Sequence, residues 1–120
     1  TALIVDDELN NIELIKLFIT SFCTEISIIG NAQSIEEVIA FLEHSTPQII
    51  FLDIKLNEKL SFQIVDQIQA LGIRIIFVTA YGKDVITKAN ISDVEFVQKP
   101  IDIDELIEAC NKTITQINNK

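Results

Sequence analysis

The sequence is poor in cysteine, glycine, proline and histidine, and each shortage excludes a class of protein. Its 120 residues include 2 Cys, 3 Gly, 2 Pro and 1 His, with no Met and no Trp. Because Cys23 and Cys110 stand alone within apolar helical patterns, we expect free structural thiols in a reducing compartment rather than a disulfide framework. The single histidine, His44, excludes a multi-histidine zinc site and disfavours a histidine-dependent catalytic triad.

Positive charge and long apolar runs are also scarce. Lys and Arg number 9 against 18 Asp and Glu, which gives a net charge of -9. An acidic surface repels a phosphate backbone, so we expect this domain to bind cations or basic partners and no nucleic acid. No apolar run approaches the roughly 18 residues that a membrane helix needs, and the amino end lacks a signal sequence. We therefore expect no membrane association and a cytoplasmic location.

The sequence is instead rich in apolar residues, which make up 48% of a chain long enough for one domain. Short apolar runs with strand character alternate with longer stretches of helical period. The five runs are Ala2 to Val5, Ile26 to Gly30, Ile49 to Leu52, Arg74 to Val78 and Val94 to Val97. This alternation predicts an α/β fold of five β/α units, with a parallel sheet covered on both faces. We expect residues 1–120 to form this one domain, as a fragment of a longer chain.

Local signals place the helices between these runs. The first helix should span Leu9 to Phe22, with an apolar face at steps of three and four residues, formed by Ile12, Ile15, Phe18, Ile19 and Phe22. Ser34 and Asp102 each precede a glutamate by three residues, a capping-box spacing that predicts where the second and last helices begin. Gly72 should close the third helix.

Polar residues follow four of the five predicted strands. Asp6 and Asp7 follow the first, Asp53 the third, Thr79 the fourth, and Lys99 comes two residues after the fifth. Right-handed crossovers place all strand carboxyl ends at one edge of a parallel sheet, where ligands bind in such folds. Taken singly, each residue could cap a turn or lie on an ordinary surface. Their joint occurrence favours a site.

The composition of this predicted edge suits phosphoryl chemistry with a metal ion. The acids in IVDDE, Ile4 to Glu8, repel one another unless a cation relieves the charge, and oxygen ligands of this kind suit Mg²⁺. A carboxylate beside such an ion can act as nucleophile toward a phosphoryl group and form an aspartyl phosphate. A hydroxyl and an ammonium would hold the remaining phosphoryl oxygens. The sequence has no GxGxxG and no GxxxxGK[ST] motif for other phosphate chemistry.

With these residues in place, the sequence resembles the receiver domains of two-component response regulators. IVDDE, FLDIKL, VTAY and QKP occur in the order of that family and cover essentially the whole chain. The resemblance implies a three-layer, doubly wound, flavodoxin-like (βα)5 fold with strand order 2-1-3-4-5. It also implies that Asp53 is the phosphoacceptor and that Mg²⁺ binds Asp6, Asp7, Asp53 and the backbone carbonyl of Lys55.

The same resemblance assigns the remaining roles and partners. Thr79 and Lys99 would contact the phosphoryl group, and Thr79 with Phe96 would form the switch. A sensor histidine kinase or phosphotransfer protein would supply the phosphoryl group, and the domain would modify and dephosphorylate itself rather than turn over a substrate. The change would pass to an output domain, with homodimerisation on phosphorylation. The motifs FLDIKL, SFQI and VTAY are similar to those of regulators whose output module is a LytTR-type DNA-binding domain.

The sequence departs from the pattern of this family at two positions. Asn57 and Ser61 stand where the family usually has proline and glycine, so we expect the loop through NEKLS to be more mobile or differently shaped.

Two other functions are alternatives to a receiver domain. One is a small phosphatase of the haloacid dehalogenase type, although the DxD motif of that group is broken at Lys55. The other is a pseudo-receiver that signals without phosphate, which missing site residues would support.

Overall fold

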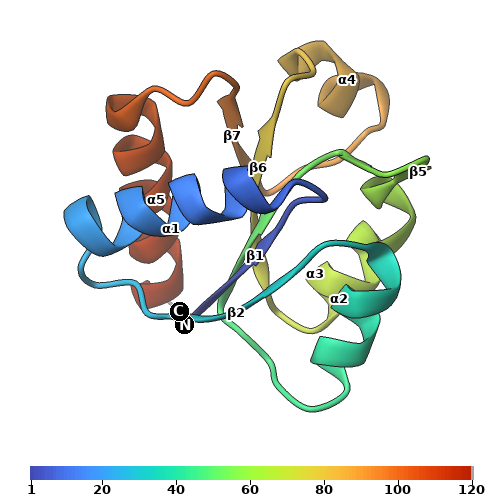
Figure 1. Cartoon of the computed structure of the whole chain (residues 1–120), viewed down its shortest axis with the longest axis horizontal. Coiled ribbons are helices and arrows are strands. Elements are labelled where there is room, and N and C mark those ends of the chain that lie inside the picture. Colours follow the sequence, from blue (N-terminus) through green and yellow to red (C-terminus); the bar gives the residue numbers. More distant parts are fainter. Residues whose placement is uncertain (120) are drawn as a thin grey trace.

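Five parallel strands form the central sheet, in the order β2-β1-β3-β6-β7 (Figure 1). They are β1 (Ala2–Val5), β2 (Ile28–Ala32), β3 (Ile49–Leu52), β6 (Arg74–Thr79) and β7 (Val94–Gln98). This computed structural model describes residues 1–119. Since β6 and β7 are the fourth and fifth strands of the sheet, the strand order 2-1-3-4-5 expected from the sequence is confirmed.

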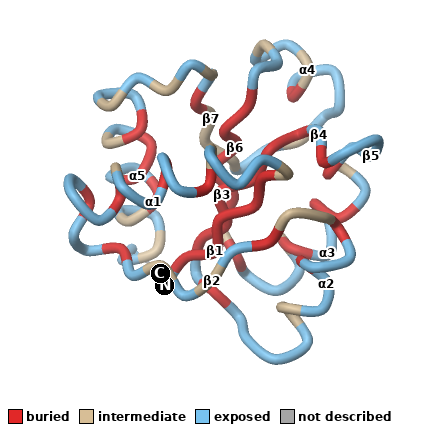
Figure 2. Tube along the Cα trace, viewed as in Figure 1, coloured by how far each residue is buried: buried red, intermediate tan, exposed pale blue. Residues whose placement is uncertain are grey.

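Helices cover both faces of this sheet and divide the core into two apolar layers. Figure 1 shows α1 (Leu9–Phe22) and α5 (Ile103–Asn118) on one side, and α2 (Ile35–Leu42) and α3 (Val65–Ala70) on the other. The short α4 (Lys83–Lys88) also packs on the side of α2 and α3, through the buried Ile86. The buried segments of Figure 2 are concentrated in the strands between these layers. The predicted three-layer α/β architecture is confirmed.

Strand boundaries follow the apolar pattern best where both faces of the strand are buried. Every residue of β1 and β3 is buried, and both strands have the predicted bounds. The edge strand β2 pairs with β1 alone and is half exposed, and it begins at Ile28 rather than at Ile26. An edge strand that has only one neighbouring strand is partly exposed to solvent. It needs no continuous apolar run, so its limits are poorly marked in the sequence.

The first helix has the predicted bounds, but its buried face is narrower than expected. Ile12, Ile15 and Ile19 are buried, and Phe18 is half-buried against the same layer. Phe22 is 54% exposed, so its assignment to the core face was wrong. It is the last residue of α1, so its ring lies at the end of the helix rather than along its buried length.

The predicted helix ends are confirmed by their hydrogen bonds. The Ser34 hydroxyl accepts from the backbone N–H of Glu37 (3.1 Å) at the start of α2. The Asp102 carboxylate accepts from the N–H groups of Asp104 and Glu105 at the start of α5. Gly72 has a positive φ of 80° just after α3, the conformation that favours glycine at a helix end.

A small hairpin interrupts the third β/α unit. The antiparallel strands β4 (Lys55–Leu56) and β5 (Lys59–Leu60) turn at Asn57 and Glu58, and a single 3₁₀ turn, η1 (Ser61–Ile64), leads into α3. Asn57 has a φ of 59°, which asparagine tolerates better than most residues. The loop through NEKLS forms a hairpin, which protrudes at β5 in Figure 1.

Two further expectations concern the cysteines and the membrane. Cys23 and Cys110 are free and buried in the layer between the sheet and helices α1 and α5. Burial beside the Cys23 thiol raises the pKa of Cys110 well above its ordinary value, so this thiol stays protonated and unreactive. Within residues 1–119, no helix is both long and apolar enough to span a membrane.

Candidate functional site

The structure brings three predicted acids together at the carboxyl edge of the sheet. Asp6 and Asp7 follow β1, and Asp53 follows the neighbouring strand β3. One carboxylate oxygen from each lies within 4.8 Å of the other two, so the three could share a metal ion. Among residues 1–119, this is the one group of three or more acidic, histidine or cysteine side chains with that geometry. Hard oxygen donors at this spacing suit a hard divalent cation.

Lys99 joins two of these acids across the sheet. Its Nζ lies 2.7 Å from Asp6 Oδ2 and 2.9 Å from Asp53 Oδ2. The exposed fractions of the three side chains are only 17% for Lys99, 1% for Asp6 and 11% for Asp53. The backbone N–H of Lys99 also donates to the Thr79 carbonyl at 2.7 Å, which fixes the chain where it leaves β7. The cation is therefore held in place by both its main chain and its side chain.

The protonation of this pair reflects burial opposed by charge. Burial lowers the pKa of Lys99, but its hydrogen bonds to Asp6 and Asp53 outweigh that effect and hold the pKa above its ordinary value. Burial raises the pKa of Asp6 above its ordinary value, although the hydrogen bond from Lys99 opposes the shift. Asp6 is thus a buried carboxyl whose ionised form the adjacent ammonium stabilises.

Hydrogen bonds that involve the backbone hold the acids further. Asp6 Oδ1 accepts from the N–H of Glu8 at 2.9 Å, which keeps the turn after β1 tight. Asp7 Oδ2 accepts from the N–H of Asn57 at 2.8 Å, across the tip of the β4–β5 hairpin. The Asp53 carbonyl accepts from the Ser61 hydroxyl at 2.7 Å. The sequence marks Asn57 and Ser61 only as departures from a family pattern and gives no sign of these contacts with Asp7 and Asp53.

A hollow of about 560 Å³ opens above this cluster. Its lining includes the predicted residues Asp7, Asp53, Lys55, Thr79 and Lys99, together with Asn11 and Tyr81, which the sequence did not single out. The hollow is open on one side to solvent and lined mainly by polar groups, so it suits a small charged ligand.

Thr79 and Phe96 occupy different positions relative to the hollow. Thr79 ends β6, is fully buried, and its Oγ1 accepts from the N–H of Tyr81 at 3.4 Å. Phe96 is half-buried on β7, in register with Phe77 of β6, and lines a separate hollow between β7 and α5. The structure therefore brings Thr79 to the site and leaves Phe96 one strand away, on the far side of β6 from the acids.

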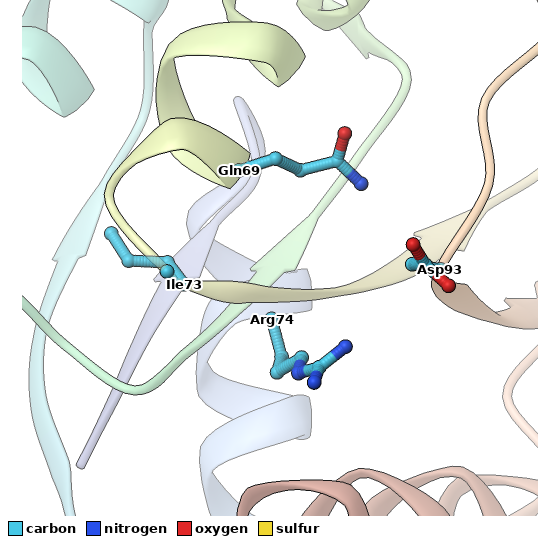
Figure 3. A pocket seen from close by; sticks show the side chains of 5 residues that line it. Gln69, Ile73, Arg74 and Asp93 are labelled. Atoms are coloured by element: carbon cyan, nitrogen blue, oxygen red, sulfur yellow. The ribbon is translucent and has the colours of Figure 1, made fainter. Parts of the chain in front are cut away.

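Another hollow lies at the opposite edge of the sheet, where β6 begins. Figure 3 shows the side chains of Gln69, Ile73, Arg74 and Asp93 around it. Its volume is about 260 Å³, and the Gln69 amide donates to the Ser92 carbonyl at 2.8 Å. It includes one acid and one base and no group of converging carboxylates, so the carboxyl edge of the sheet remains the candidate site.

A family model and several curated proteins match most of this chain. The family model described as response regulator receiver domain matches residues 2–111. The chain is 32% identical over 114 residues to the sensory transduction protein LytR of Staphylococcus epidermidis, and 29% identical over 113 residues to LytT of Bacillus cereus. Both alignments cover 92% of this chain, which spans 44% and 46% of the length of those relatives.

Solved structures show the same fold. The response regulatory domain of protein mrkE from Klebsiella pneumoniae has a TM-score of 0.84 at 20% identity, with both chains fully covered. A two-component transcriptional regulator AraC from Clostridium phytofermentans has a TM-score of 0.82 at 25% identity, covering 98% of this chain and 95% of that chain.

The ion cluster predicts a pH-dependent effect of removing Lys99. In metal-free buffer, Lys99→Met should lower the free energy of unfolding at pH 7 by about 3 kcal/mol, because two buried carboxylates lose their cation. Without Lys99 the pKa of Asp6 should rise further. A protein that holds a carboxyl with a raised pKa in the folded state becomes less stable as the pH rises through that pKa. The loss should therefore be smaller near pH 4, as measured by urea unfolding at both pH values.

The control is Lys112→Met, which removes an exposed lysine that pairs with Glu108 within α5. This variant should change stability little, and equally at the two pH values. An equal loss for Lys99→Met at pH 4 and pH 7 would contradict the described coupling between Lys99 and Asp6.

Proposed function

Because the chain belongs to the response regulator receiver domain family of two-component systems, we propose that it is a switch phosphorylated on Asp53 in the presence of Mg²⁺. One observation carries this proposal: the Asp53 carboxylate lies beside Asp6 and Asp7 and accepts a hydrogen bond from the Lys99 ammonium, in a hollow that Thr79 also lines. Receiver domains are signalling domains, so the expected product is the modified domain itself rather than a released compound.

The proposed transfer uses the groups of the hollow in distinct roles. An Asp53 carboxylate oxygen attacks the phosphorus of a phosphohistidine, the P–N bond breaks, and the histidine nitrogen leaves with the bonding electrons and takes up a proton. Lys99 Nζ, 2.9 Å from Asp53 Oδ2, and the Thr79 hydroxyl lie where they can hold oxygens of the transferred group. Hydrolysis of the acyl phosphate would later return the carboxylate.

The acids have the chemistry of a magnesium site. Asp6, Asp7 and Asp53 offer carboxylate oxygens, and the backbone carbonyl of Lys55 at the start of β4 would add a neutral oxygen. Bound there, Mg²⁺ would offset charge on the phosphoryl oxygens during transfer. The hard oxygen donors present fit this ion better than a soft transition metal.

The proposed relay runs from the site along β6 and β7. Thr79 is fully buried, so an inward movement toward a phosphoryl group would change the packing of an interior that favours discrete arrangements. Phe96 lies on the neighbouring strand and lines the hollow between β7 and α5 with Lys83, Glu105 and Lys112. We expect its ring to move with Thr79 and to alter the surface formed by α4, β7 and α5.

The proposed partners follow from the family and from the length of the chain. A cytoplasmic sensor histidine kinase or phosphotransfer protein would supply the phosphoryl group. The chain spans under half of the LytR and LytT relatives, so we expect an output domain of the LytTR DNA-binding type elsewhere in the full-length protein. Activation would also favour a homodimer through the α4–β7–α5 surface, which carries charges of both signs.

The alternatives have less support from the site. A phosphatase of the haloacid dehalogenase type needs a second carboxylate two residues after its nucleophile, and that position is Lys55, whose side chain is exposed. A pseudo-receiver would lack some of the acidic, hydroxyl and lysine residues, but Asp6, Asp7, Thr79 and Lys99 are all present.

The phosphoacceptor is tested by labelling. Incubated with Mg²⁺ and acetyl phosphate, the protein should gain one phosphoryl group that is stable in acid and labile in base, and intact-mass analysis should show it. Asp53→Asn keeps the shape of the side chain but removes the nucleophilic carboxylate, so it should abolish labelling. Asp66→Asn, at an exposed acid of α3, is the matched control and should label normally. Undiminished labelling of Asp53→Asn would contradict the assignment of Asp53 as the phosphoacceptor.

The metal site is tested by titration. Asp7→Ala should weaken Mg²⁺ binding by about tenfold or more, because a site with few protein ligands loses one of its carboxylates. Isothermal titration or the Mg²⁺-dependent rise in melting temperature measures the effect, with Asp66→Ala as the control. If Asp7→Ala binds Mg²⁺ as the unchanged protein does, Asp7 is only a solvated acid beside the Asn57 amide.

The relay is tested with a phosphoryl mimic. Beryllofluoride with Mg²⁺ should shift the protein toward dimer in sedimentation velocity and should move the NMR signals of Phe96 and β7. Thr79→Val keeps the shape of the side chain but removes the hydroxyl, so it should suppress both effects while beryllofluoride still binds at Asp53. NMR changes confined to the surroundings of Asp53, with β7 silent in the unchanged protein, would contradict the relay.

A further inference from the structure

Ser61 forms two hydrogen bonds with the chain that carries the proposed phosphoacceptor. Its hydroxyl donates to the Asp53 carbonyl at 2.7 Å, and its N–H donates to the Ile54 carbonyl, also at 2.7 Å. The residue is completely buried, at 0% exposure, at the point where β5 ends and the 3₁₀ turn begins. A buried hydroxyl with a short hydrogen bond to a carbonyl is rigid, because losing that bond would leave polar atoms unpaired.

The position of Asp53 explains why such a contact matters. The parallel pairing of β3 with β6 ends at Leu52, opposite Phe77, so Asp53 lies one residue beyond the paired strand. On the side of β1, its N–H donates to the Val5 carbonyl at 3.1 Å. Ser61 holds the other end of the same residue, its carbonyl. Together the two contacts determine the direction in which the Asp53 side chain leaves the backbone.

The β4–β5 hairpin makes this contact part of a larger support. The pairs Lys55 with Leu60 and Leu56 with Lys59 return the chain from Asp53 to Ser61. At its tip, the Asn57 N–H donates to Asp7 Oδ2 at 2.8 Å. Leu56 anchors the hairpin in the core at 1% exposure. One short segment therefore contacts both the proposed phosphoacceptor and an acid of the proposed metal site.

We propose that Ser61 is a positioning residue for Asp53, whose hydroxyl keeps the carboxylate aimed into the hollow beside Lys99. This inference rests on the proposed function, since it concerns the rate at which Asp53 accepts a phosphoryl group. A glycine or alanine at this position would keep the N–H bond to Ile54 and lose the bond to Asp53. The backbone of Asp53 would then sample more directions, and an attacking oxygen misplaced by about 1 Å can slow a reaction by up to about a hundredfold.

The experiment compares Ser61→Ala with a variant that loses an equivalent hydroxyl elsewhere. Thr113 of α5 is also buried, at 1% exposure, and its hydroxyl donates to the Ala109 carbonyl at 2.9 Å, away from the site. Thr113→Val is therefore the matched control. Labelling rates are measured with acetyl phosphate at saturating Mg²⁺ over a range of donor concentrations, and melting temperatures are recorded for each variant.

We expect Ser61→Ala to reduce the maximal labelling rate roughly tenfold, with little change in the donor concentration that gives half of that rate. Ser61→Gly, a second variant without the hydroxyl, should be equally slow, and Ser61→Thr, which keeps the hydroxyl, should recover most of the rate. Thr113→Val should label at the unchanged rate even where its melting temperature falls as far as that of Ser61→Ala.

The outcomes separate this inference from the proposed function. If the unchanged protein labels at Asp53 and Ser61→Ala labels equally fast, the positioning role of Ser61 is wrong and the proposed function stands. If Ser61→Ala and Thr113→Val slow in proportion to their loss of stability, the effect is structural and the positioning role is again wrong. If the unchanged protein takes up no phosphoryl group, the proposed function is wrong, and the inference falls with it.

Discussion

The site depends on the contact of the Lys99 ammonium with two carboxylates. The ammonium lies within 3 Å of carboxylate oxygens from Asp6 and Asp53, which follow two neighbouring strands, while the main chain of Lys99 is fixed to Thr79 on a third. Three acids this close repel one another, and burial adds to the cost of ionising Asp6. Lys99, which follows the last strand of the sheet, therefore supplies the positive charge that allows the acids to lie together at the carboxyl edge.

The parallel sheet makes this interaction possible. Lys99 is separated from Asp6 by 93 residues and from Asp53 by 46, and only the common direction of the strands brings all three to one edge. The two apolar layers hold the strands in register, so the positions of the charges follow from buried residues that carry no charge. The alternation of apolar strands with helices thus determines both the packing of the core and the positions of the charged groups at the edge of the sheet.

This pattern also explains how far the sequence could predict the molecule. Strands β1 and β3 could be placed to the residue because they are apolar throughout, and the acids after them could be expected to meet. The hairpin β4–β5 could not, since two-residue strands carry no periodic signal. The contact of Asn57 with Asp7 uses a backbone N–H, which any residue except proline would supply, so its identity gave no sign of the role.

The contacts of Lys99 and Ser61 with Asp53 differ in a way that bears on signalling. Lys99 contacts the carboxylate, the group that would change charge on phosphorylation, so its hydrogen bonds would have to be redistributed. Ser61 contacts the carbonyl of the same residue, which a phosphoryl group leaves untouched. The segment from Asp53 to Ser61 would then act as a fixed support in both states. If this support stays fixed, the proposed change would leave through Thr79 and Lys99, on the side of β6 and β7.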